Sequence, residues 1–283
     1  MARPSTLQWL AIATAAVAVV GGVVAIATAR ASNERKRMSK ASKREQNRVR
    51  RRQKKDERLQ ARKTERSAAL ELRARMMTNE QRQEEIERIK MRRVEQYQKL
   101  EHGLTHGVRV VVDLAFAVEQ TERECNSILK QVGCLYGYMK KCPLDSVMSL
   151  RLASFDGSIA DLSSRHGVNG WKVLLHKDPL RDVYASEDIV YLSPDAETVL
   201  EEIDPSKVYV VGGIVDRTVR KNETLSKAQA HSYQTARLPL HEHMTVRKPV
   251  LNIDSVLIAL NEFNNHHDWK RAFDIAVPKR LAH

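Results

Sequence analysis

Cysteine is scarce in this chain of 283 residues, and the only three are Cys125, Cys134 and Cys142. No two of them form a Cys-x-x-Cys pair, the spacing typical of thiol redox motifs and many zinc sites. An odd number at these spacings argues against a disulfide framework. This cysteine usage suggests a reducing compartment rather than a secreted protein.

Familiar catalytic motifs are also missing. The sequence has no phosphate-binding glycine-rich loop and no recognisable Ser-His-Asp order. The nearest approach to a metal site is His241-x-His243 and the pair His266-His267. No acid or cysteine is spaced to complete a set of ligands around either pair. We therefore expect no bound metal.

Proline and glycine are absent from residues 33–100, which are rich in Arg, Lys, Glu, Gln and Ala. That composition favours helix. The positive charge gathers here, because residues 34–63 hold 15 Lys and Arg against 4 Asp and Glu, whereas residues 101–283 hold 22 against 24. A block this basic attracts phosphate, in nucleic acid or in anionic lipid headgroups. We interpret residues 32–100 as a basic helical arm that binds RNA, and a solvated helix is the alternative.

Charge is absent between Pro4 and Ala29, where Leu10–Ala29 is an apolar run of 20 residues. About 20 residues are what a helix needs to cross a bilayer. The basic residues that follow favour a location facing the cytosol or the matrix. Residues 1–31 are thus predicted to be a transmembrane or targeting segment that anchors the protein to a membrane through residues 7–29. A mitochondrial presequence is the rival, because no acidic residue precedes Glu34.

Strand-like and helix-like segments alternate from His102 onward. The pattern predicts strands at 108–113, 146–153, 170–176, 188–192 and 207–211, and helices at 119–141, 195–202, 224–232, 251–263 and 267–276. Thr121 and Glu124 form a capping box at the start of the helix over 119–141. Alternation of this kind predicts an α/β domain with a mostly parallel sheet over residues 101–283.

The stretch Val208–Asp216 predicts a binding site. Its apolar run is typical of an interior strand. Gly212 and Gly213 then let the backbone bend or let a ligand approach closely. Asp216 follows the carboxyl end of the strand, where open α/β sheets bind their ligands.

Several motifs, taken in order, resemble the eukaryotic and archaeal tRNA purine-9 N1-methyltransferases of the SPOUT class. The motifs are Tyr191–Asp195, Tyr209–Asp216, Ala236–Leu240, Val250–Leu251 and the segment Asp268–Arg280, and the match spans roughly residues 105–280. The resemblance implies a SPOUT-type trefoil-knotted α/β fold. It also implies a monomeric catalytic domain that transfers a methyl group from S-adenosylmethionine to tRNA.

The family pattern further implies which residues form the site. Backbone groups of three loops would bind S-adenosylmethionine, and these loops contain Leu192, Ser193, Gly212, Gly213, Thr224, Leu238, Leu251, Asn252 and Ile253. Asp216 matches the residue proposed as general base. N1 of guanine carries a proton that must leave, whereas N1 of adenine has a free lone pair, so guanine is favoured at position 9 and adenine is the alternative.

The RNA contacts implied by the resemblance are less complete. Candidate RNA-binding residues are Gln131, Lys140, Lys141 and Arg217. For each of the three cations, an ordinary solvated side chain at the surface is an equally good explanation. Cys134 stands where the family often has an arginine, whose guanidinium fork would bind phosphate. Such departures motivate an alternative function, a non-catalytic tRNA-binding scaffold subunit of a mitochondrial tRNA-processing complex.

Overall fold

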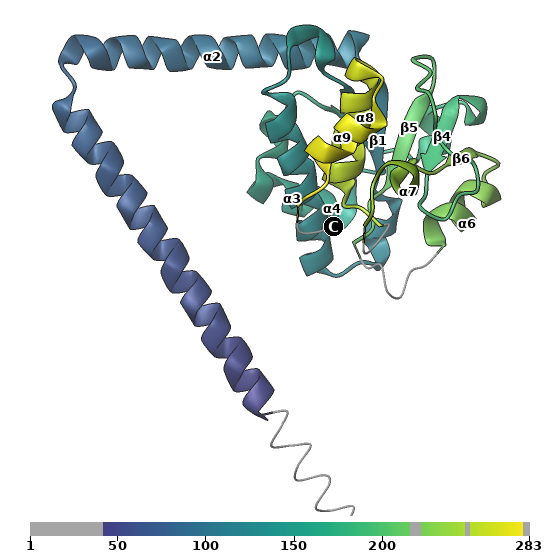
Figure 1. Ribbon diagram of the computed structural model, residues 1–283, viewed down its shortest axis with the longest axis horizontal. Helices are drawn as coiled ribbons and strands as arrows, with labels where there is room; N and C mark the ends of the chain where they lie inside the picture. The colour runs from purple at the N-terminus through teal and green to yellow at the C-terminus, as the bar shows by residue number, and fades with distance from the viewer. Residues whose placement is uncertain (1–41, 216–221, 247–249, 280–283) are drawn as a thin grey trace, which may run out of the picture. The chain divides into compact units, whose positions relative to one another are not determined.

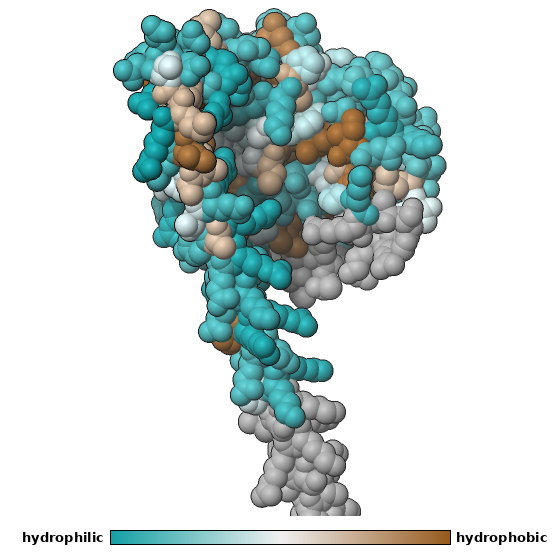
Figure 2. Space-filling model, turned by 60° about the vertical axis from the view of Figure 1, so that its left-hand side comes forward, coloured by the Kyte–Doolittle hydropathy of each residue, from teal (hydrophilic) through white to brown (hydrophobic). Residues whose placement is uncertain are grey.

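The computed structural model describes residues 42–215, 222–246 and 250–279 (Figure 1). It divides into two compact units, one ending at Glu85 and the other beginning at Ile86. The first unit contains a helix over residues 42–76 and the start of α2 (Asn79–His106). Its first helix is covered by hydrophilic side chains with isolated apolar ones between them (Figure 2).

Within the described part of the basic arm, residues 42–100, the chain forms two helices, because a second helix start lies inside it. Helix geometry is interrupted at Met77 and Thr78. The Thr78 hydroxyl accepts from the Gln81 backbone N–H at 3.2 Å, and the Gln81 side chain accepts from the Thr78 N–H at 3.0 Å. This reciprocal pair is a capping box that begins α2. The absence of proline and glycine concealed this break.

A six-stranded sheet in the order β3-β2-β1-β5-β4-β6 forms the centre of the second unit. The strands are β1 (Arg109–Asp113), β2 (Ser149–Ala153), β3 (Leu174–Leu175), β4 (Ile189–Leu192), β5 (Val208–Gly212) and β6 (Gln234–Ala236). Neighbouring strands pair in parallel. Strand β5 is buried at every position and lies between β1 and β4, so the prediction of an interior strand is confirmed.

Helices cover both faces of this sheet. They are α3 (Glu122–Met139), α4 (Gly157–Ser163), α5 (Leu180–Val183), α6 (Glu223–Ala230), α7 (Leu240–His243), α8 (Ile253–His266) and α9 (Trp269–Ala276), with 3₁₀ turns η1 (Leu114–Glu119), η2 (Leu144–Ser146), η3 (Ser164–His166), η4 (Val168–Gly170) and η5 (Ser186–Asp188). Helices α3, α4, α8 and α9 share the main core with one face, and α5 and α6 contribute to a smaller core on the other. The predicted α/β class and parallel sheet are confirmed.

The predicted helix over 195–202 is wrong. Residues after β4 instead exchange backbone hydrogen bonds with residues after β6. Leu200 N–H donates to the Arg237 carbonyl, and Arg237 N–H donates to the Thr198 carbonyl, both at 2.8 Å. Ser193 followed by Pro194 is a typical helix start, but here the pairing between the two segments satisfies the backbone groups that a helix would have used.

The end of α2 belongs to the folded domain. Leu100 is fully buried, and Lys99 Nζ donates to the Cys142 carbonyl at 3.1 Å. A Cβ atom on Gly103 would lie 2.9 Å from the Val147 carbonyl oxygen, so glycine permits this close packing.

The prediction of a membrane-anchored location does not stand. Among the residues that the structure describes, none of the helices combines the length and the apolar character that crossing a membrane requires. The apolar run Leu10–Ala29 lies outside the described residues.

Candidate functional site

The carboxyl ends of β5, β4 and β6 lie side by side at one edge of the sheet, because these strands are parallel neighbours. Ser193, directly after β4, donates its N–H to the Ala236 carbonyl at 3.0 Å. The Thr224 hydroxyl donates to the Ser193 hydroxyl oxygen at 3.0 Å, which joins α6 to the same edge. Two of the three predicted cofactor loops therefore meet there.

Gly212 and Gly213 are required by close packing at this edge. A Cβ atom on Gly212 would lie 2.6 Å from the Thr224 methyl group, and one on Gly213 would lie 2.9 Å from the Asp113 carbonyl oxygen. That oxygen accepts a hydrogen bond from the Gly213 N–H at 2.8 Å. A side chain at either position would push apart the chain segments that form the edge.

The third predicted loop is tied to α3. The N–H of Ile253, the first residue of α8, donates to Gln131 Oε1 at 2.9 Å. Leu238 and Leu251 are partly buried and pack against the main core. Helix α8 also contacts β5. The structure thus packs this loop against the main core and engages Gln131, a predicted RNA-binding residue, in holding it.

A buried carboxylate lies beneath this edge. Asp113, the last residue of β1, has no exposed surface, and its Oδ2 accepts from the Tyr191 hydroxyl at 2.8 Å and from Lys227 Nζ at 2.5 Å. Its Oδ1 accepts from the Ala115 N–H at 3.1 Å. Burial, and then the nearby Asp113 charge, raise the pKa of Tyr191, so its phenol remains a donor.

Sequence reasoning missed the role of Asp113 and its cationic partner. The buried charge is compensated by Lys227, because an unpaired carboxylate in this environment would be strongly unfavourable. The sequence carried part of the signal for such a site: Asp113 stands at the end of a β-branched strand, much as Asp216 follows one. Pairing Asp113 with a lysine 114 residues later required the tertiary structure.

The candidate RNA-binding cations lie at the end of α3. Lys140 Nζ lies 4.6 Å from the centre of the Tyr136 ring, and Lys141 is exposed. Cys134 is also exposed on this helix. Asp216 and Arg217, predicted as general base and phosphate contact, lie outside the described residues. Within the described part of the chain, no cluster of three or more His, Cys, Asp or Glu side chains could hold a metal ion.

These features define an α/β domain with a parallel sheet and a candidate ligand site at the carboxyl ends of its strands. Residues 29–282 match the family model described as tRNA (guanine(9)-N(1))-methyltransferase TRM10/TRM10A. The chain belongs to this family, so the family resemblance noted from its motifs is confirmed.

Relatives and solved structures agree with this membership. The chain is 31% identical over 189 residues to tRNA methyltransferase 10 homolog B of Rattus norvegicus, covering 64% of this chain and 60% of the relative. It is 30% identical over 183 residues to the tRNA (guanine(9)-N1)-methyltransferase of Schizosaccharomyces pombe, covering 61% and 59%. The crystal structure of the full-length spTrm10–SAH complex superposes with a TM-score of 0.55 at 27% identity, covering 60% of this chain and 94% of that one. The chain thus spans about 60% of the length of these curated relatives.

Proposed function

We propose that this protein transfers a methyl group from S-adenosylmethionine to N1 of guanine 9 in tRNA. The observation that carries the proposal is the family match over residues 29–282. The S. pombe relative is named as a guanine-9 N1-methyltransferase, which favours guanine and favours an enzyme over a scaffold. The spTrm10 structure contains SAH, the product left when S-adenosylmethionine gives up its methyl group.

The residues at the sheet edge fit this cofactor. Leu238 and Leu251, which are only partly buried, offer apolar surface for adenine, while the backbone of the glycine turn and of the loop before α8 offers donors and acceptors. When bound, S-adenosylmethionine supplies an electrophilic methyl group on a positively charged sulfur. We assign its binding to the nine residues predicted from the sequence, and Gln131 to holding Ile253 in place. The trefoil knot is part of this proposal.

Asp216 is proposed as the general base. The carboxylate would accept the N1 proton of guanine, directly or through water, as the methyl group arrives. Lys140, Lys141 and Arg217 would contact phosphates, and the basic residues 34–63 would hold the tRNA backbone. The folded domain has slightly more acidic than basic residues, so it needs such an arm to attract RNA.

Methylation of defined transcripts tests the function. Unmodified tRNA transcripts carrying guanine, adenine or cytosine at position 9 would be incubated with the protein and labelled S-adenosylmethionine, and position 9 read by primer extension. We expect a stop at guanine 9 and none at cytosine 9. A protein that binds tRNA in titration calorimetry but neither binds the cofactor nor methylates would instead be the scaffold subunit.

Asp216→Asn tests the base. We expect kcat on guanine-9 tRNA to fall by about 10²-fold or more, which is typical for loss of a general base. The Kd for S-adenosylhomocysteine should change little, because the backbone is assigned to cofactor binding. Asp161→Asn, at an exposed aspartate of α4, is the matched control. An equal loss in both variants, or an unchanged kcat in Asp216→Asn, would contradict this role.

A further inference from the structure

Gln120 bridges the chain between η1 and α3 to the turn after β5. Its side chain is almost wholly buried. Nε2 donates to the Gly213 carbonyl at 2.6 Å, and Oε1 accepts from the Val215 N–H at 3.3 Å. Both ends of one carboxamide are therefore used on the same turn, 93 and 95 residues away in the chain.

Among the described residues, the Val215 side chain packs against the main core, and the two glycines before it depend on backbone hydrogen bonds. Gly212 and Gly213 have no side chains to pack, so backbone hydrogen bonds must position the chain there. The Asp113 carbonyl accepts from the Gly213 N–H at 2.8 Å, and Gly212 accepts from the Ile214 N–H at 2.9 Å. Gln120 is the side chain that satisfies the turn at Gly213 and Val215, as a neighbouring strand would.

We propose that Gln120 is a positioning residue for methyl transfer, which acts by fixing the backbone of Gly213–Val215. This inference rests on the proposed function. The turn contains a predicted cofactor contact, Gly213, and leads directly into Asp216 in the sequence. Asp216 directly follows Val215 in the sequence, and a small misplacement of a catalytic group costs a large factor in rate.

Gln120→Met removes both hydrogen bonds while keeping nearly the same length and volume. We expect kcat on guanine-9 tRNA to fall about tenfold or more, with KM for tRNA changed by less than about twofold. Asn261→Leu is the matched control, because Asn261 is a buried carboxamide of α8 that donates to the Tyr138 hydroxyl at 3.0 Å, outside the proposed site. The control should lose comparable thermal stability and keep kcat. Equal kcat in wild type and Gln120→Met would overturn the proposal.

Gln120→Glu provides a second measurement, the pH dependence of activity, which a loss of stability alone would not produce. A protonated carboxyl has the donor and acceptor pattern of the amide, whereas a carboxylate cannot donate to the Gly213 carbonyl. The activity of Gln120→Glu relative to wild type should therefore rise as pH falls, because any effect of pH that both proteins share cancels in the ratio. A ratio independent of pH would contradict the proposed role of the donor.

Hydrogen exchange separates this inference from the proposed function. Amides of residues 213–215 should exchange faster in Gln120→Met and be unchanged in Asn261→Leu, whether or not the protein is active. Unchanged exchange in Gln120→Met would overturn the positioning role alone. Absence of methyl transfer by the wild-type protein would overturn the proposed function, and with it the catalytic consequence of the positioning.

Discussion

At the scale of single residues, close packing at the candidate site depends on the absence of side chains at Gly212 and Gly213. Gly212 admits the Thr224 side chain and Gly213 admits the backbone of Asp113. Thr224 uses its hydroxyl on Ser193 and its methyl group on Gly212. The same threonine therefore determines both the polar link and the steric limit at this edge.

Gly212→Ala and Thr224→Ser form a double-mutant test of this contact. Gly212→Ala alone should lower the free energy of unfolding by about 1–3 kcal/mol, because its methyl group overlaps the Thr224 methyl group. Thr224→Ser removes that methyl group and keeps the hydroxyl, so the double variant should recover most of the loss. Denaturant unfolding measures each variant. Simple additivity of the two changes would contradict the contact.

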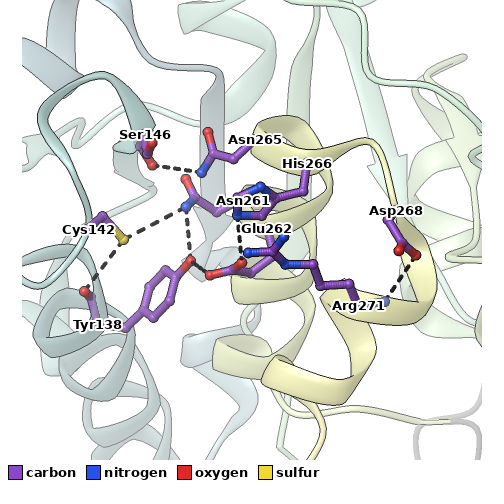
Figure 3. A network of polar contacts seen from close by, with 9 residues as sticks. All are labelled: Tyr138, Cys142, Ser146, Asn261, Glu262, Asn265, His266, Asp268 and Arg271. Carbon is purple, nitrogen blue, oxygen red and sulfur yellow. Dashed lines mark hydrogen bonds and ion pairs between the residues drawn. The ribbon is translucent and has the colours of Figure 1, made fainter.

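At the scale of elements, α3 holds α8 at both ends. Gln131 binds the first N–H of α8, and a polar cluster lies further along both helices (Figure 3). There the Tyr138 hydroxyl donates to Glu262 Oε1 at 2.5 Å and accepts from Asn261 Nδ2 at 3.0 Å. His266 lies 3.5 Å from the other Glu262 oxygen. These contacts join the carboxyl-terminal half of α8 to the end of α3, away from the first residue of α8.

Tyr138→Phe should destabilise the domain and change how its stability depends on pH. Loss of the hydroxyl removes the donor to Glu262 Oε1 and the acceptor for Asn261 Nδ2, which costs about 1–3 kcal/mol near neutral pH. Burial and the hydrogen bond to Glu262 raise the pKa of Tyr138 above its unfolded value of about 10. The stability from this shift is complete below about pH 10 and is lost as pH rises further.

Denaturant unfolding at several pH values tests the direction in which stability changes with pH. Wild type should lose more stability than Tyr138→Phe as pH rises above about 10, because only the wild type has this phenol to ionise. Tyr97→Phe, at an exposed tyrosine of α2, is the control and should follow the wild type. A steeper decline in Tyr138→Phe than in the wild type would contradict the argument.

At the scale of the whole molecule, charge and site are in different parts of the chain. Residues 34–63 hold an excess of 11 positive charges, whereas the residues of the proposed site belong to the slightly acidic region beyond residue 100. In the proposed function, the second unit would carry the methyl-transfer site and the basic segment would attract the phosphates of tRNA. The division into two units is consistent with this distribution of roles.

Neutralising five cations of the arm should weaken tRNA binding and its dependence on salt. The changes are Arg50→Gln, Arg51→Gln, Arg52→Gln, Lys54→Gln and Lys55→Gln, which preserve helix propensity. The slope of log K against log salt should decrease in magnitude by up to about 4. The control removes five exposed cations from the folded domain, Arg165, Lys177, Arg181, Lys270 and Arg271. Equal loss of affinity in both variants would contradict a special role for the arm.

Local signals predicted much of the fold. The β-branched runs predicted β1, β4 and β5, and the capping box at Thr121 and Glu124 predicted the start of α3, which the structure forms with both hydrogen bonds. They failed where a distant segment competes for backbone groups, as after Ser193, and where a capping box lies within a uniformly helical composition, as at Thr78.

The sequence by itself determined the parallel α/β class, the separation of a basic arm from a domain without excess positive charge, and the family with its glycine turn, because each depends on periodicity, charge or local motifs. Only the tertiary structure decided which residues support that turn. Asp113 with Lys227, and Gln120 with Gly213 and Val215, pair residues about a hundred positions apart. Such pairings follow from the order of strands in the sheet, which no local pattern specifies.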